Sequence, residues 1–198
     1  MARSIACALA APSLKNRQEQ SGGGKTCPQN AGAYPSGSCS GRWRRTNPTS
    51  RLDLDACELD EQAMCALALA IESNTSLREL RLARVDISAP VAQFLARALK
   101  ANSSLLRLTL DDCFMQLAQA RILNSILYES TALREFHLTL DEHGNPDAHQ
   151  IARAFAAAAA RSSILLQMTM GPTVRDGLAQ AQNRLAENRR RLQPGLET

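Results

Sequence analysis

An internal repeat with a period of 28 is the feature of this sequence that most restricts how the chain can fold. The apolar pattern Leu-x-x-Leu-x-Leu, or a close variant of it, begins at Leu77, Leu105 and Leu133, and the spacing between successive copies is constant. An incomplete copy precedes them at Leu52, and another follows at Leu165, displaced by 32 because the fourth unit contains an insertion. Apolar residues that alternate with polar ones indicate a strand with one buried face. The pattern therefore predicts a series of short, equivalent strands.

The second half of each unit repeats as well. Apolar residues recur at i, i+1, i+4 and i+5, a spacing that places them on one face of a helix. A polar turn then leads into the next strand, and successive turns contain Asn74, Asn102, Ser130 and Ser162. One unit cannot bury its apolar face alone, whereas about four and a half stacked units form a continuous core. The apolar helix positions are Ala66, Leu67, Ala70, Ile71, Phe94, Leu95, Ala98, Leu99, Ile122, Leu123, Ile126, Leu127, Ala154, Phe155, Ala158 and Ala159.

Together, the period, the Leu-x-x-Leu-x-Leu core and the alternating helix resemble the leucine-rich repeat family over residues 52–170, specifically its long-repeat class, which includes ribonuclease inhibitor. Cys57 and Cys113 match the positions where that family closes a side-chain ladder with Asn or Cys, whereas Val85 and Asp141 depart from it. The resemblance implies an α/β leucine-rich repeat solenoid of about 4 to 5 strand–helix units. Its parallel strands would line the concave face and its helices the convex face. Bacterial members of the class include secreted effectors, so the resemblance also implies a bacterial effector-type protein.

Charge divides the chain into three regions. Residues 1–50 carry seven Lys/Arg and one Glu. Residues 51–170 carry eleven Lys/Arg and fifteen Asp/Glu, and residues 171–198 carry five Arg and three Asp/Glu. The first region is rich in Gly, Pro and Ser, so we expect a disordered basic tail. The second is the repeat domain. The third is predicted to form a capping helix over 173–193, followed by a short tail, because solenoid ends need shielding.

The repeat predicts which side chains point away from the core, and these are the candidate partner-binding residues. Neighbouring parallel strands would place the alternating charges of Arg51, Glu79, Arg107 and Glu135 in one row. The structural alternative is that opposite charges merely neutralise one another, at about 0 to 1 kcal/mol for each exposed pair. Position 83, an alanine, is expected to point outward as well. The full candidate set is Arg51, Asp53, Glu79, Arg81, Arg107, Thr109, Asp111, Glu135 and His137.

No pattern in the sequence indicates catalysis, so we expect no catalytic, cofactor-binding or metal-binding residues. His137 has Thr109 and Thr169 as predicted neighbours rather than a carboxylate. His143 and His149 fit no standard metal spacing, and the six cysteines include no C-x-x-C pair.

The leading interpretation is a non-enzymatic module that binds a protein partner through its concave charged face, as a monomer in the cytoplasm or after secretion into a host cell. The alternative is a nucleic acid or membrane-surface binder that acts through the basic residues 1–50, where an aromatic residue stands among arginines at 42–45.

Overall fold

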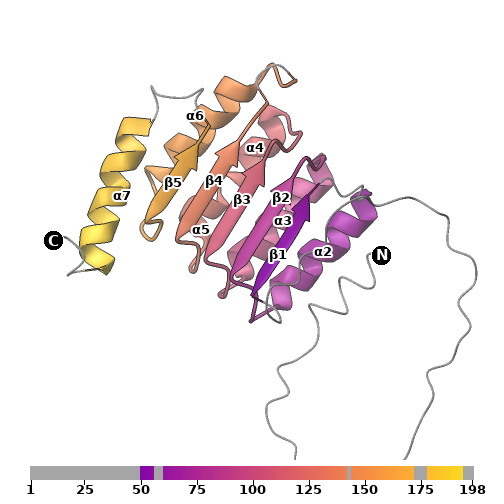
Figure 1. Cartoon of the computed structure of the whole chain (residues 1–198), viewed down its shortest axis with the longest axis horizontal. Coiled ribbons are helices and arrows are strands. Elements are labelled where there is room, and N and C mark those ends of the chain that lie inside the picture. Colours follow the sequence, from indigo (N-terminus) through magenta and orange to yellow (C-terminus); the bar gives the residue numbers. More distant parts are fainter. Residues whose placement is uncertain (1–49, 56–59, 142–143, 172–177, 194–198) are drawn as a thin grey trace, which may run out of the picture.

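A computed structural model, which describes residues 50–55, 60–141, 144–171 and 178–193, shows a parallel sheet lined by helices. The sheet has five strands in the order β1-β2-β3-β4-β5 (Figure 1). They are β1 (Arg51–Asp55), β2 (Glu79–Ala83), β3 (Arg107–Asp111), β4 (Glu135–Thr139) and β5 (Gln167–Met170). The helices are α2 (Glu61–Ser73), α3 (Ala89–Ala101), α4 (Leu117–Leu123), α5 (Ile126–Glu129), α6 (Ala148–Ala159) and α7 (Leu178–Leu192).

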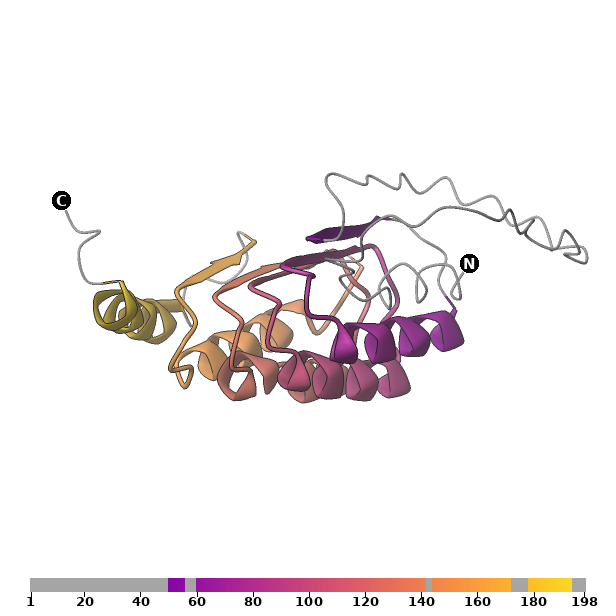
Figure 2. The same ribbon diagram turned by 90° about the horizontal axis from the view of Figure 1, so that it is seen from below.

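Strand and helix alternate along the chain, so the expected α/β class is confirmed. Helices α2 to α6 all lie on one face of the sheet (Figure 2). The register also agrees with the period of the repeat, because Arg51 is paired with Glu79, Glu79 with Arg107 and Arg107 with Glu135. The last pair, Glu135 with Gln167, has the longer offset that the insertion in the fourth unit predicts.

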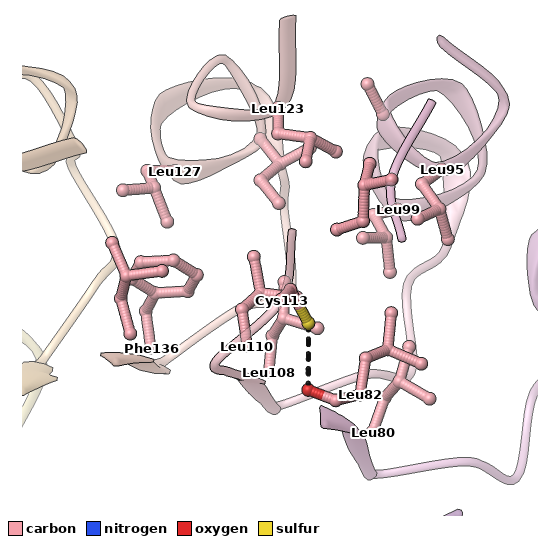
Figure 3. Packing of buried hydrophobic residues seen from close by; sticks show 14 of the residues in the cluster. Leu80, Leu82, Leu95, Leu99, Leu108, Leu110, Cys113, Leu123, Leu127 and Phe136 are labelled. Carbon is pink, nitrogen blue, oxygen red and sulfur yellow. Dashed lines mark hydrogen bonds between the residues drawn. The ribbon is translucent and has the colours of Figure 1, made fainter. Parts of the chain in front are cut away.

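The core fills the space between the sheet and the helices. Leu80, Leu82, Leu108 and Leu110 point from β2 and β3 toward the helical layer and are buried (Figure 3). Each fully buried side chain of this size contributes about 1.5–3 kcal/mol through removal from water. The rings of Phe136 and Phe155 stack with their centroids 5.2 Å apart and so join β4 to α6. The apolar positions of the repeat therefore hold the two layers together.

The polar turns after the helices form a second repeated structure. The Asn74 side-chain oxygen accepts hydrogen bonds from the backbone of Ser76 and Leu77 at 2.9 and 2.6 Å. Asn102 makes the equivalent turn, and its amide nitrogen also donates to the carbonyls of Ile71 and Asn74, both at 2.7 Å. Buried backbone groups must find partners, and the turn at Asn102 supplies such partners to the unit before it.

Helix α7 ends the stack beside β5 (Figure 1). It packs against α6 and β5, with Ala181 and Leu185 buried. The amide nitrogen of Asn188 donates to the carbonyls of Ser162 and Leu165 at 3.0 and 2.9 Å. The Ser104 hydroxyl donates to the equivalent carbonyls of an earlier unit, those of Asn74 and Leu77, so a helix supplies the donor that a further turn would have supplied.

Two features differ from the expectations. The helix expected across the third unit is divided into α4 and α5 at Asn124 and Ser125. The Ser125 hydroxyl donates to the carbonyl of Ile122 at 2.7 Å, a bond of the type that competes with regular helix. Ala83, expected to point outward, is buried.

Several predictions fall outside the described residues: those for 1–49, for Cys57, for His143 and for the start of the terminal helix before Leu178. Within the part of the chain that the structure describes, no helix is long and apolar enough to cross a membrane.

Candidate functional site

The candidate site is the face of the sheet that points away from helices α2 to α6, which we call the open face (Figure 2). Alternation along each strand places every second side chain there. All nine predicted partner-binding residues occupy these positions, from Arg51 on β1 to His137 on β4. The register thus brings together residues that are one repeat apart in the sequence.

One row of the open face is a continuous chain of ion pairs across β1 to β4. Arg51 lies 3.7 Å from Glu79, and Arg107 contacts both Glu79, at 2.9 Å, and Glu135, at 2.6 Å. The hydrogen bond to Glu135 raises the pKa of Arg107, against the lowering effect of burial. The predicted alternation of charge therefore exists as a set of mutual contacts.

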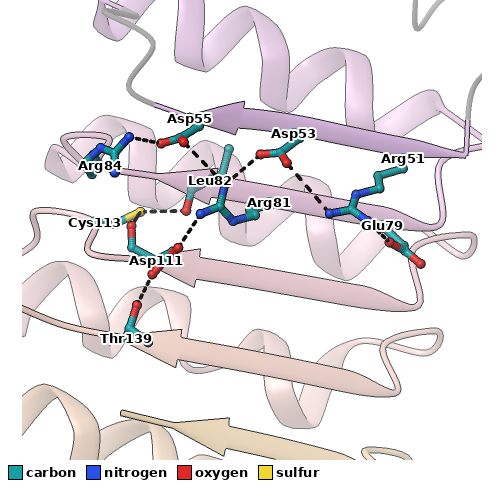
Figure 4. Close-up of polar contacts among 10 residues, drawn as sticks. All are labelled: Arg51, Asp53, Asp55, Glu79, Arg81, Leu82, Arg84, Asp111, Cys113 and Thr139. Carbon is teal, nitrogen blue, oxygen red and sulfur yellow. Dashed lines mark hydrogen bonds and ion pairs between the residues drawn. The ribbon is translucent and has the colours of Figure 1, made fainter. Parts of the chain in front are cut away.

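A second cluster surrounds Arg81 (Figure 4). Its guanidinium donates to Asp53 at 3.0 Å and to Asp111 at 2.5 Å, and it lies 3.8 Å from Asp55. Arg84 contacts the other oxygen of Asp55 at 2.6 Å. In the strand register, Ala83 is paired with Asp55 on one side and with Asp111 on the other. The Arg81 side chain contacts both of these carboxylates, which explains why Ala83 is covered.

In this second cluster, hydrogen bonds outweigh the effect of burial on the pKa values of Asp111 and Arg81. Burial would raise the pKa of Asp111, but hydrogen bonds from Thr139 and Arg81 lower it overall. Burial would lower the pKa of Arg81, yet the bonds to Asp111 and Asp53 raise it. Both groups are therefore held in their charged forms. Three members of this cluster, Asp55, Arg84 and Thr139, were not among the predicted site residues. The register rule would have found Asp55 and Thr139, whereas Arg84 lies beyond the strand with a φ of 53° and carries no such signal.

The other half of the open face carries polar side chains that form no ion pair among the described residues. Thr109, His137 and Thr169 lie side by side on β3, β4 and β5, as the sequence predicted, and Gln167 lies next to Glu135. Within the described ranges, none of these four side chains has a hydrogen bond to another residue. They retain donors and acceptors for a ligand, and removing them from water requires no ion pair to be dehydrated.

The described thiols have little thiolate at neutral pH. Burial raises the pKa of Cys113 to about 11, and its sulfur lies 3.2 Å from the carbonyl of Leu82 (Figure 3). Burial also raises the pKa of Cys65, with a smaller contribution from Glu61. The thiolate is the nucleophilic form of cysteine, so neither residue is activated. His149 is exposed on α6, away from the open face.

No model of a protein family matches the chain, and no curated protein matches it. Solved structures do match. The chain is similar to the actin-binding site 2 (ABS2) of leiomodin-1, with a TM-score of 0.61 and 19% identity over 72% of this chain and 82% of that one. It is also similar to the C-terminal domain of tropomodulin from Caenorhabditis elegans, with a TM-score of 0.59 and 14% identity over 73% and 86%. At such identities the likeness concerns the fold alone.

These matches correct the family expected from the sequence. The assignment to the ribonuclease inhibitor-like class of leucine-rich repeats is wrong, because the matching folds are those of leiomodin and tropomodulin domains. The bacterial effector type, which rested on that assignment, is not confirmed. The physical reason lies in the polar ladder. At the strand ends Cys113 bonds to the preceding unit, but Val85 has no polar side chain. The turns after the helices, such as that of Asn102, supply the repeated bonds instead.

Proposed function

We propose that this chain is a non-enzymatic interaction domain that binds a protein partner through the open face of its sheet. The observation that carries the proposal is an ordered array of polar side chains on the open face. Helices α2 to α6 lie on the other face of the sheet (Figure 2). In repeat-like folds with this layering, the exposed face of the strands is the usual binding surface.

The two halves of the open face would contribute in different ways. The ion pairs around Arg81 and Arg107 fix their side chains before a partner arrives, which reduces the entropy lost on binding. These charges are already satisfied, so they favour orientation and partner selection over affinity. His137, Gln167 and Thr169 have unused hydrogen-bonding groups, and we place the main contacts there.

The likeness to the leiomodin-1 domain, which is named for an actin-binding site, makes actin the first partner to test. Fluorescence anisotropy with monomeric actin and co-sedimentation with filaments would measure binding by the full chain, and light scattering would check that it is monomeric. A photo-crosslinking amino acid at position 169 would capture a partner other than actin, because Thr169 is exposed on the open face.

A matched pair of variants tests the surface itself. We expect His137→Ala with Thr169→Ala to weaken partner binding by about tenfold or more, the effect of losing an interface hot spot. The control is His149→Ala with Gln150→Ala, which removes similar side chains from the exposed side of α6. Binding that survives the first pair and disappears with the second would refute the assignment to the open face.

A further inference from the structure

The edge of the sheet where the strands begin lies at the bottom of Figure 1. It carries a row of alternating basic and apolar residues, Arg78, Leu106, Arg134 and Leu166. The backbone of Leu106 donates to Arg78, that of Arg134 to Leu106 and that of Leu166 to Arg134, each at 2.8 Å, so these residues are direct neighbours. Helix α7 continues the row, because Arg189 donates from Nε to the carbonyl of Leu166 at 2.8 Å. We call this row, together with Arg161, Arg191 and Leu192 at the same end of α6 and α7, the basic edge.

Positive charge on the basic edge is not neutralised by neighbouring acids. Within the described residues, Arg78, Arg134, Arg161, Arg189 and Arg191 form no ion pair with a carboxylate. The acidic residues at this end are paired with other bases: Glu79 and Glu135 with Arg107, Glu129 with Lys100, and Glu187 with Arg184. An excess of guanidinium groups therefore faces the solvent.

The arginines are held in place by contacts that leave most of their donors unused. Arg78 donates to the carbonyl of Ser104 at 2.8 Å, and the Arg161 guanidinium lies 4.0 Å from the centre of the Tyr128 ring. Arg191 donates to the carbonyl of Ser163. A guanidinium has five N–H donors, so these contacts position the groups and leave capacity for an anion.

Apolar exposure accompanies the charge. Leu106 is 43% exposed and Leu192 is 41% exposed, and they are two of the four large apolar side chains that are exposed among the described residues. Hydrogen bonds to the backbone carbonyls of the turns would explain why arginines occur at this edge. They would not explain why exposed leucines occur among these arginines. The opposite edge of the sheet is acidic, with Asp60, Glu61, Asp86, Asp112 and Asp147 near the ends of the strands and the starts of the helices.

The basic region 1–49 joins the fold at this same edge. The carbonyl of Ser50 accepts hydrogen bonds from the backbone of Arg78, at 2.7 Å, and of Glu79, at 2.9 Å. Residues 1–49 contain seven Lys/Arg and one Glu.

We propose that the basic edge binds the surface of an anionic lipid bilayer, with the arginines on lipid phosphates and carboxylates and the leucines in the interface. Basic residues that alternate with exposed apolar ones are the pattern of interfacial membrane binding. A polynucleotide would also attract the arginines but would gain nothing from Leu106 and Leu192. The acidic edge points away from the membrane in this orientation, so like-charge repulsion fixes which edge approaches.

Sedimentation of the full chain with vesicles tests the proposal. Vesicles of phosphatidylcholine alone would be compared with vesicles that contain about a third phosphatidylserine, at low and moderate salt. We expect binding only to the anionic vesicles, weakened by salt. Arg134→Gln with Arg189→Gln should lower the partition coefficient about 30-fold, since each basic residue near an anionic surface is worth about fivefold. The control, Arg121→Gln with Arg153→Gln on the helical layer, removes the same charge and should change it no more than about threefold.

Further variants separate the sources of binding. Leu106→Ser with Leu192→Ser should weaken vesicle binding while leaving its salt dependence unchanged, and circular dichroism would confirm that each variant is folded. The proposal is overturned if the control pair lowers binding as much as the edge pair does. It is also overturned if neutralising Arg42, Arg44 and Arg45 alone abolishes binding while the edge pair has no effect, or if the chain binds a single-stranded oligonucleotide but not the vesicles.

Discussion

Replacing Arg81 with methionine would test whether the ion pairs of the open face stabilise the fold. Methionine keeps an unbranched apolar stem of similar reach but removes the guanidinium. The change deletes the hydrogen bonds to Asp53, at 3.0 Å, and to Asp111, at 2.5 Å, and the contact to Asp55. It leaves these carboxylates close to one another without the base that lies between them.

The expected magnitude follows from the exposure of these groups. The side chains of Arg81, Asp53 and Asp111 are 27%, 25% and 28% exposed, so they are neither fully solvated nor fully buried. Breaking a buried pair costs about 3–5 kcal/mol, whereas an exposed pair contributes about 0–1 kcal/mol. We therefore expect Arg81→Met to lower the free energy of unfolding by about 2 kcal/mol at pH 7, a value between these limits.

The pH dependence of this effect has a defined sign. The pKa of Asp111 is lower in the folded protein than its ordinary value, because the bonds from Thr139 and Arg81 outweigh burial. Such a group stabilises the fold above its unfolded pKa, near pH 4, and the stabilisation is lost as the pH falls through the folded pKa. The difference between wild type and Arg81→Met should thus be largest near neutral pH and shrink below about pH 4.

Urea denaturation followed by circular dichroism, repeated from pH 7 down to pH 3, would measure this difference. The matched control is Arg97→Met, because Arg97 pairs with Glu72 at 3.2 Å on the helical layer but is 57% exposed. We expect it to change stability by less than about 0.5 kcal/mol. Equal effects of the two substitutions, or a difference that stays constant between pH 7 and pH 3, would show that the cluster around Arg81 does not stabilise the fold.

Two further predictions concern stability. Leu108→Ala should lower the free energy of unfolding by about 2–5 kcal/mol, because it leaves a cavity in the core. Thr109→Ala, at the neighbouring half-exposed position, should change the free energy of unfolding by no more than about 0.5 kcal/mol. Equal losses of stability in denaturant titrations of the two variants would contradict the strand register. Asn188→Ala should cost about 1–3 kcal/mol, because the carbonyls of Ser162 and Leu165 lose their buried donor. Hydrogen exchange at the end of α6 should rise in that variant, and unchanged exchange would argue against α7 as the cap of the stack.

Most of the strand register could be read from the sequence because it depends on local spacing. Side chains alternate between the two faces of each strand, and the offset between units is constant. Together these leave one arrangement that turns every leucine of the pattern toward the helical layer. The neighbours of His137 followed from the same rule. The break between α4 and α5 did not, because the apolar positions on either side of Ser125 still fit a single helix.

By itself the sequence determined the α/β class, the strand order and the residues of the open face, since all of these repeat along the chain at a fixed distance. Only the tertiary structure decided which charges pair and which remain unneutralised. Arg81 forms ion pairs with Asp53 and Asp111, which lie on the two neighbouring strands, and Arg84, which follows β2, forms one with Asp55. The basic edge depends on where α7 docks, because Arg189 joins Leu166 through a segment of chain that follows no repeat. The repeat spacing brings Asp53 and Arg81 within reach of each other, but which partners each arginine contacts is set by the packing of whole elements in three dimensions.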